Sequence, residues 1–576
     1  MSKEIEHIED LLSKGRYFEA KTAAEKELAG NGNLRLRQLH ALATSKSGAP
    51  KLAIDSLEPV YHQHPDDPET AGILGGIYKE IFKRDQDTRY ALQSRDVYLK
   101  NYQSTRNFYT GINAATMSAI AGQSSKGREI AQQLIQQLEQ QPKGFWEIAT
   151  LGEAYLLTKD RQAAMDHYFQ ARKLAGTDWG KIGSVYNQLW LLNHYVPVPS
   201  EILKNFSPPA VVSVVGHMID HPSRATPRFP AYIEPNVKEA IAGALRTLNA
   251  KIGYCSLACG GDIIFAEAML EAGGELSVWI PFAKEDFIET SLRFAGEEWI
   301  QRFDRLVTQV PVHYLTQDRY DGHDDLFTFL SQVIYGSAII RSTINHSTPY
   351  LLTVLSETDL KRKEGGTRDA SSLWPYPQQH ININPDQYHR PDVRLVQGNA
   401  PPPFHPPRTR DRPLLYCVTA DFVGFTDEEN RAWWKKFVEK SEWPLPAPEA
   451  FEEGAMLMAC FTSIAGATNH LRRVLREVNA VRKGHQLRAS LFANPLVLEP
   501  GSSPEMKKLS SASVARLKMF HELLSPGSVY ALARFASVLS LDVKNFTLDY
   551  AGVLVAEGEP VSVDIFRVIM SGQGPS

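Results

Sequence analysis

Long apolar runs, a strong net charge and abundant cysteine are all missing from this 576-residue sequence. No stretch of about 18 apolar residues occurs, and the charged opening MSKEIEHIEDLL has no secretory core, so we expect no membrane span. The formal net charge is -4 and no basic run stands out, which argues against binding to DNA or RNA. We therefore expect a cytoplasmic protein that has neither membrane nor nucleic-acid partners.

Only four cysteines are present, Cys255, Cys259, Cys417 and Cys460. A zinc site would need two cysteine pairs at a characteristic spacing, and these cysteines do not form them. We therefore interpret them as small apolar side chains in a reducing compartment. The chain also lacks the G-x-G-x-x-G fingerprint, which makes an NAD site a weak prediction. At this length the composition of an ordinary globular protein, 43% hydrophobic and 22% charged, predicts about three to four domains.

The first two hundred residues contain one helix-like segment after another. The segments IEDLLSKGRYFEAKTAAEKEL and ATLGEAYLLTKDRQAAMDHYFQARKL share a rhythm of small and aromatic residues that resembles tetratricopeptide repeats, with an irregular period. The segment Asp66-Asp67-Pro68-Glu69 predicts the start of a helix, because an early proline and acids in the first turn both favour one. A repeat scaffold of this kind implies protein partners.

Three segments carry a more specific resemblance. ETAGILGGIYKEIFK, NFYTGINAATMSAIAG and WEIATLGEAYLL, at residues 69–83, 107–122 and 146–157, resemble the TRAFs-binding domain of MAP kinase kinase kinases of the apoptosis signal-regulating type. That resemblance implies a helical scaffold that gathers partners. No kinase motif follows it in this chain, since a Gly-rich loop with its lysine, HRD and DFG are all missing.

The middle of the chain alternates strand-like and helix-like runs, which predicts a parallel α/β sheet. A buried strand at 211–215 ends at Gly216 and His217, and a second one at 252–257 leads into the turn Gly260-Gly261-Asp262 before a helix. Ligands of open α/β sheets bind at this edge, and a glycine turn lets backbone N–H groups approach an anion. We therefore predict that these five residues line a nucleotide or phosphate pocket.

The order of strand, small-residue turn ending in Gly-Asp, Ala-rich helix, Gly-Gly and strand ending in Pro resembles the SLOG superfamily of Rossmann-like nucleotide binders. The resemblance implies a second phosphate-binding turn later in the domain, and Gly365, Gly366 and Thr367 match it. The Pro-Gly-Gly-x-Gly-Thr-x-x-Glu constellation of the hydrolytic members is missing. The resemblance therefore implies a nucleotide sensor rather than a phosphoribohydrolase.

The segment LLYCVTADFVGFT resembles the first metal motif of class III adenylate/guanylate cyclases, and Asp421 falls on its metal ligand. Arg516 falls on the arginine that steadies the transition state in that family. The second metal-binding Asp falls on Gly454, the base-reading lysine on Ala450 and the asparagine on Ala512. Two metal ions need more than one carboxylate, so the resemblance implies a degenerate domain that serves dimerisation or complements an intact partner.

We thus expect a multidomain signalling protein with an all-α repeat part, an α/β Rossmann-like part and an α+β cyclase-like part. The predicted boundaries are 1–200, 208–375, a proline-rich linker at 376–412, and 413–570. The expected function is nucleotide sensing, in stress or phage-conflict signalling, with a homodimer formed through a non-catalytic cyclase-like domain. The alternative is an active cyclase dimer that uses Asp421, Arg516 and Mg or Mn; a third hypothesis is a passive scaffold.

Overall fold

The computed structural model of the chain forms two compact units. The first holds Met1–Pro208, Tyr550–Asp564 and Gln573–Ser576, and the second holds Pro209–Asp549 and Ile565–Gly572. The structure describes residues 3–30, 33–140, 143–176, 178–221, 224, 226–322, 324–356, 371–390, 414–423, 425–439, 456–461, 463–478, 486–495, 511–555 and 562–570. Within these residues, no helix is long and apolar enough to cross a membrane.

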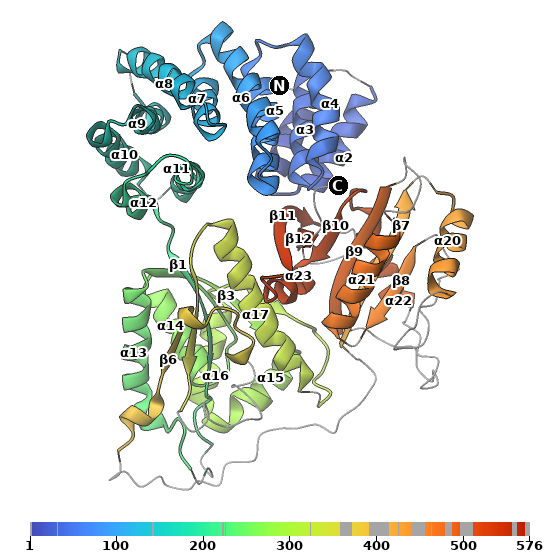
Figure 1. The fold of residues 1–576 in the computed structure, drawn as a ribbon. Coiled ribbons are helices and arrows are strands. Elements are labelled where there is room, and N and C mark those ends of the chain that lie inside the picture. The colour runs from blue at the N-terminus through green and yellow to red at the C-terminus, as the bar shows by residue number, and fades with distance from the viewer. Residues whose placement is uncertain are drawn as a thin grey trace. The chain divides into compact units, whose positions relative to one another are not determined.

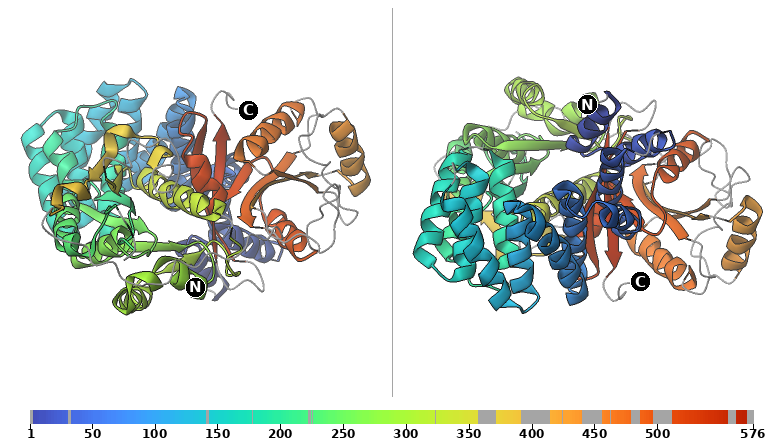
Figure 2. Two further views of the ribbon diagram at one scale, coloured as in Figure 1. Left: turned by 90° about the horizontal axis from the view of Figure 1, so that it is seen from below. Right: turned by 90° about the horizontal axis from the view of Figure 1, so that it is seen from above.

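The first unit is built from helices that stack side by side in sequence order (Figures 1 and 2). They are α1 (Lys3–Ser13), α2 (Tyr17–Leu28), α3 (Leu34–Lys46), α4 (Pro50–Gln63), α5 (Pro68–Asp85), α6 (Thr88–Thr105), α7 (Phe108–Ile120), α8 (Ser124–Glu139), α9 (Phe145–Thr158), α10 (Arg161–Ala175), α11 (Trp179–Leu192) and α12 (Ser200–Phe206). The predicted start of α5 is confirmed: the Asp67 carboxylate accepts a hydrogen bond of 2.8 Å from the backbone N–H of Thr70.

Close helix contacts explain the rhythm of small and aromatic residues. A Cβ atom on Gly75 of α5 would lie 2.7 Å from the ring of Tyr98 on α6, and one on Gly152 of α9 would lie 2.9 Å from Tyr168 on α10. Both tyrosines are almost fully buried. Each pair of helices therefore packs a large ring over a glycine, which brings the two backbones together.

The second unit contains a six-stranded sheet that has the order β4-β3-β2-β1-β5-β6, and each neighbouring pair is parallel. Its elements are β1 (Ala210–Gly216), η1 (Ala231–Ile233), α13 (Glu234–Thr247), β2 (Ala250–Cys255), α14 (Gly261–Glu271), β3 (Glu275–Ile280), α15 (Lys284–Ser291), η2 (Arg293–Ala295), α16 (Glu297–Val307), β4 (Val312–Tyr314), α17 (Asp325–Ile344), β5 (Pro349–Val354), η3 (Pro377–Gln379), β6 (His380–Ile383) and η4 (Pro385–Tyr388). The predicted parallel α/β sheet is confirmed.

One difference concerns the predicted proline-rich spacer. Residues 380–383, which we expected to be extended linker, form β6 and pair with β5. The segment HINI carries two β-branched residues between prolines, and proline is tolerated beside an edge strand such as this one. Residues 391–412 of the predicted linker lie outside the described residues.

A second sheet has the order β11-β12-β10-β9-β7-β8, and most of its residues belong to the second unit. Its elements are β7 (Leu414–Val423), α20 (Asp427–Glu439), β8 (Leu457–Phe461), α21 (Ile464–Val478), β9 (Gln486–Pro495), α22 (Ser511–Glu522), β10 (Val529–Leu532), α23 (Ala533–Ser540), β11 (Phe546–Leu554) and β12 (Val563–Met570). Side chains alternate along β7, so that Asp421 contacts α22 while Tyr416 packs on Phe535 of α23. This mixed sheet agrees with the predicted α+β part.

Candidate functional site

The carboxyl edge of the parallel sheet brings together the five residues that we predicted in its first half. Gly216 ends β1 and His217 follows it, while Gly260 to Asp262 join β2 to α14. The backbone N–H of Gly261 donates to the carbonyl oxygen of His217 over 3.1 Å. The turn after β2 thus lies directly on the turn after β1. Gly365, Gly366 and Thr367, the predicted second turn, lie outside the described residues.

The glycines of this edge serve backbone packing. Gly260 has a φ of +100°, which favours glycine, and a Cβ atom there would lie 2.6 Å from the carbonyl oxygen of His217. A Cβ on Gly216 would lie 3.1 Å from the Cα of Gly261. The two loops could not approach this closely with larger residues. The glycines are thus explained without a phosphate, which differs from our reason for singling them out.

Asp262, at the carboxyl edge of the sheet, is a buried acid with little hydrogen bonding. It lies in the first turn of α14 and is only 9% exposed. Among the described residues, its carboxylate accepts one long hydrogen bond, 3.4 Å from the backbone N–H of Ala258. Burial raises the pKa of Asp262 to about 7, because a buried charge with so little solvation is costly. A carboxylate in this state is expected at a site that a ligand completes.

Two further polar groups near this edge were not predicted. Ser256, just after β2, is 7% exposed, and Tyr335 of α17 is fully buried. Neither hydroxyl has a hydrogen-bond partner among the described residues. Burial, together with the charge of Asp262, raises the pKa of Tyr335, so the carboxylate and the phenol are electrostatically close. Ser256 follows β2 directly, so the strand pattern places it at this edge, whereas the position of Tyr335 depends on how α17 crosses the sheet.

His217 and Asp220 brace the loop after β1. Nε2 of His217 accepts a hydrogen bond of 3.3 Å from the backbone N–H of Ser356, so this ring is neutral and carries its proton on Nδ1. The carboxylate of Asp220 accepts from the backbone N–H groups of Arg228 and Phe229 at 2.8 and 2.9 Å. These two side chains hold the loop in place, and among the described residues Asp262 accepts fewer hydrogen bonds than Asp220 does.

The predicted metal ligand Asp421 has two protein partners. It lies on β7 directly opposite Arg488 on β9, whose guanidinium donates to both carboxylate oxygens, at 2.9 and 2.5 Å. His521 of α22 places Nε2 2.9 Å from the same carboxylate. These contacts hold the pKa of Asp421 near 2 in spite of its burial. Asp421 is therefore an ionised partner of a fixed cation.

His521 completes a buried relay of hydrogen bonds. Its Nδ1 lies 2.9 Å from the hydroxyl of Thr419 and 3.2 Å from that of Ser490. Burial lowers the pKa of His521, so the ring is neutral, with Nε2–H donating to Asp421 and Nδ1 accepting from a hydroxyl. The order acid, imidazole, hydroxyl is that of a nucleophilic triad. His521, Thr419 and Ser490 are all buried, however, and they hydrogen-bond to one another, so we interpret the relay as a structural network.

These residues do not fit the two-metal site that the cyclase resemblance implies. A divalent ion at Asp421 would have to displace a bidentate guanidinium, and the described residues contain no group of three or more His, Cys, Asp or Glu suited to a metal. Arg516 lies on α22, but the partners that the structure gives Asp421 are Arg488 and His521. The hairpin around Gly454 lies outside the described residues, so metal ligation by Asp421 stays a prediction.

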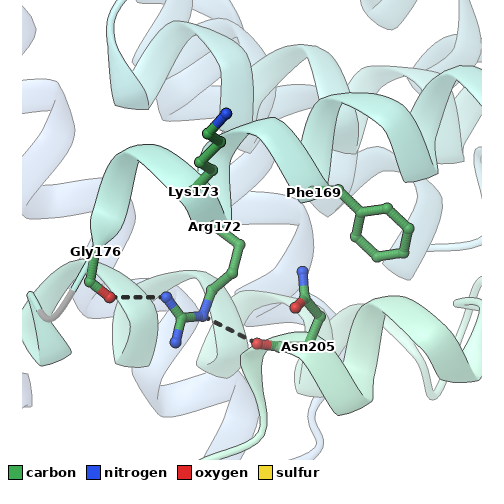
Figure 3. A pocket seen from close by; sticks show the side chains of 5 residues that line it. All are labelled: Phe169, Arg172, Lys173, Gly176 and Asn205. Carbon is green, nitrogen blue, oxygen red and sulfur yellow. Dashed lines mark hydrogen bonds between the residues drawn. The ribbon is translucent and has the colours of Figure 1, made fainter.

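An open hollow of about 440 Å³ lies between α10 and α12 of the first unit (Figure 3). The guanidinium of Arg172 points between two backbone carbonyl oxygens, those of Asn205 at 3.1 Å and Gly176 at 2.8 Å. An arginine in the last turn of a helix commonly satisfies such carbonyls. The hollow is thus a consequence of helix capping, and nothing at it indicates a ligand.

A buried polar network crosses four helices of the first unit. The Lys79 ammonium on α5 donates to Asn113 of α7 at 3.1 Å and to Gln188 of α11 at 2.6 Å. Gln188 in turn donates to Glu153 of α9 at 2.6 Å. Burial lowers the pKa of Lys79 to about 8 and raises the pKa of Glu153. The network satisfies its own members, so we interpret it as a structural tie.

Comparison with known proteins supports the repeat part of the chain. The family described as Tetratricopeptide Repeats-Sensor matches residues 12–118. Among solved structures, a thermophilic TPR protein from Thermus thermophilus is similar, with 18% sequence identity and a TM-score of 0.28. The match covers 32% of this chain and 97% of the Thermus protein. No curated protein matches the sequence. The amino-terminal helices are thus similar to tetratricopeptide repeats.

Two cyclases are also among the similar solved structures. The adenylyl cyclase CyaB from P. aeruginosa is 13% identical over 29% of this chain and 98% of that chain, with a TM-score of 0.21. An adenylate/guanylate cyclase/hydrolase from Silicibacter pomeroyi is 16% identical over 28% of this chain and 100% of that chain, with a TM-score of 0.22. The likeness is weak, and it carries no conclusion about activity. The SLOG and TRAFs-binding resemblances stay predictions.

Proposed function

We propose that this chain is a signalling scaffold whose parallel α/β sheet binds a nucleotide or a nucleotide-derived ligand. In this proposal, the tetratricopeptide-like helices hold protein partners, and the mixed sheet is a non-catalytic module for dimerisation or relay. The TRAFs-binding and SLOG resemblances motivate the proposal, as does the expectation of stress or phage-conflict signalling. Ligand occupancy at the sheet edge would be the input, and partner capture would be the output.

One observation carries the ligand-binding part of the proposal. Three polar side chains, Asp262, Ser256 and Tyr335, are buried around the carboxyl edge of the sheet and, among the described residues, are left poorly satisfied or unpaired by the protein. Buried polar groups are almost always hydrogen-bonded, because leaving one unpaired costs about 1–3 kcal/mol. A ligand with hydroxyl, amine and carbonyl groups would offset that cost, and this edge is where open α/β sheets bind ligands.

Titration calorimetry on the full chain tests the binding. The panel contains ATP, GTP, their monophosphates and their cyclic monophosphates. Tyr335→Phe, which removes one unpaired hydroxyl, is expected to weaken binding about tenfold. Tyr350→Phe is the matched control, because Tyr350 lies near the start of β5 at the opposite edge of the sheet. A folded wild-type protein that gives no heat with any nucleotide would refute the proposal.

The second candidate function is a class III nucleotide cyclase. It is favoured by the match of Asp421 and Arg516 to that family's motifs and opposed by the engagement of Asp421 with Arg488 and His521. Incubation with ATP or GTP and Mn²⁺, followed by detection of the cyclic product, separates the two. Product formed by the wild type and lost in Asp421→Ala would establish the cyclase; we expect none from either protein.

A further inference from the structure

The first turn of α14 carries its own negative charge. Asp262 lies there, 9% exposed, and its carboxylate accepts the backbone N–H of Ala258, in the loop before the helix. A helix N-terminus attracts an anion through its free N–H groups and its dipole. Here the first turn already carries a carboxylate, and a phosphate placed beside it would be repelled by like charge.

The turn that precedes α14 is closed to a phosphate in a second way. The N–H of Gly261 is bonded to the carbonyl oxygen of His217, and the backbone of residues 217–219 fills the space beside Gly260. Phosphate-binding glycine turns keep their N–H groups and this space for the ligand. The turn after β2 is instead packed against the turn after β1.

The groups that remain available all suit the uncharged part of a nucleotide. The Asp262 carboxylate accepts hydrogen bonds, and the hydroxyls of Ser256 and Tyr335, which have no partner among the described residues, can donate or accept them. Ribose hydroxyls and base amines donate to a carboxylate, whereas phosphate oxygens at neutral pH do not. The raised pKa of Asp262 agrees with a carboxylate that lacks its donor partners.

We propose that Asp262 is the specificity-determining carboxylate of the site, and that it binds a ribose hydroxyl or base amine of the nucleotide. This inference rests on the proposed function and corrects our own expectation that the Gly260-Gly261-Asp262 turn cradles phosphate. The phosphates of the ligand then lie away from the start of α14.

The direction in which an Asp262 substitution changes ligand affinity shows whether a ribose or base, or instead a phosphate, lies at the start of α14. Wild type, Asp262→Asn and Asp262→Ala are titrated at pH 8 with adenosine, guanosine, their mono- and triphosphates, and pyrophosphate. Glu271→Gln, at the exposed end of the same helix, is the control. If Asp262 accepts a ligand donor, both Asp262 variants lose about 10- to 100-fold in affinity for nucleosides and nucleotides alike. Pyrophosphate then fails to compete.

A phosphate at the start of α14 would give the opposite change in affinity. If α14 binds phosphate, removal of the negative charge tightens triphosphate binding, and pyrophosphate competes. That outcome overturns this inference and leaves nucleotide binding intact. A wild-type protein that binds nothing in the panel overturns the proposed function and this inference together. Circular dichroism and thermal unfolding of each variant establish that the loss is not caused by unfolding.

Discussion

At the scale of single residues, Asp421 is held by an arginine and a histidine. Its pKa near 2 lies below the ordinary value of about 4, so its ionised form stabilises the folded state above pH 4, and that contribution is lost as the pH falls from 4 to 2. A shift of this size corresponds to about 2–3 kcal/mol.

We therefore expect Asp421→Asn to lower the stability of the second unit by about 2–3 kcal/mol at pH 7, because Arg488 loses its counterion. Thermal melting at pH 7 and at pH 2.5 measures the effect, and the difference from wild type should shrink at the lower pH. Glu428→Gln, an exposed acid on α20, is the control. An equal loss at both pH values would contradict the assignment.

The pKa of Asp262 is shifted in the opposite direction to that of Asp421. Its pKa of about 7 is raised above that of the unfolded chain, so the protonated form stabilises the fold below pH 4, and this stabilisation is lost as the pH rises from 4 to 7. Above pH 7 the buried charge costs on the order of 4 kcal/mol. Asp262→Asn should therefore raise the melting temperature at pH 8 and change it little at pH 4. A variant that is less stable than wild type at pH 8 would contradict this account.

At the scale of elements, the turn between β2 and α14 depends on glycine. In Gly260→Ala, the alanine would have to keep a φ of +100°, and its Cβ would lie 2.6 Å from a carbonyl oxygen. Gly273→Ala, at the end of α14, has a φ of +69° but no atom within 4 Å of the new Cβ. We expect about 1 kcal/mol of destabilisation at Gly273 from strain alone, and more than about 3 kcal/mol at Gly260. Equal losses in chemical denaturation would refute the packing role.

The helices of the first unit are tied together by the buried Lys79 network. Lys79→Met leaves Glu153 buried without its cation, so we expect a loss of about 3–5 kcal/mol. The double variant Lys79→Met/Glu153→Gln removes both charges and should recover part of that loss. Melting of the two single variants and the double variant measures the coupling. Additive losses would mean that the two groups do not interact.

The sequence predicts the elements better than it predicts the site. The predicted strands at 211–215 and 252–257 are apolar runs between turn signals, and they correspond to β1 and to β2, which begins and ends two residues earlier than expected. The strand β6 was missed because prolines surround it. Arg488 could not be predicted as the partner of Asp421, because their contact depends on the register of β7 against β9 across 67 residues. Tyr335 was missed for the same reason: only the crossing of α17 over the sheet brings it near Asp262.

At the scale of the whole molecule, we expect the ligand to bind to the second unit alone. A ligand at about 100 times its dissociation constant stabilises the part of a protein that binds it by about 2.7 kcal/mol. Nucleotide should therefore raise the melting transition of the second unit and leave that of the helical unit unchanged. Differential scanning calorimetry, with Asp262→Ala as the control, resolves the two transitions. A shift confined to the helical transition would place the ligand site among the repeats instead.

The proposed nucleotide site lies at the edge of the parallel sheet. It is tested by calorimetric titration of the full chain with the nucleotide panel. We expect a saturable heat at one site per chain that is weakened about tenfold by Tyr335→Phe and unaffected by Tyr350→Phe. No heat from any nucleotide, or an equal effect of the two tyrosine variants, would contradict it.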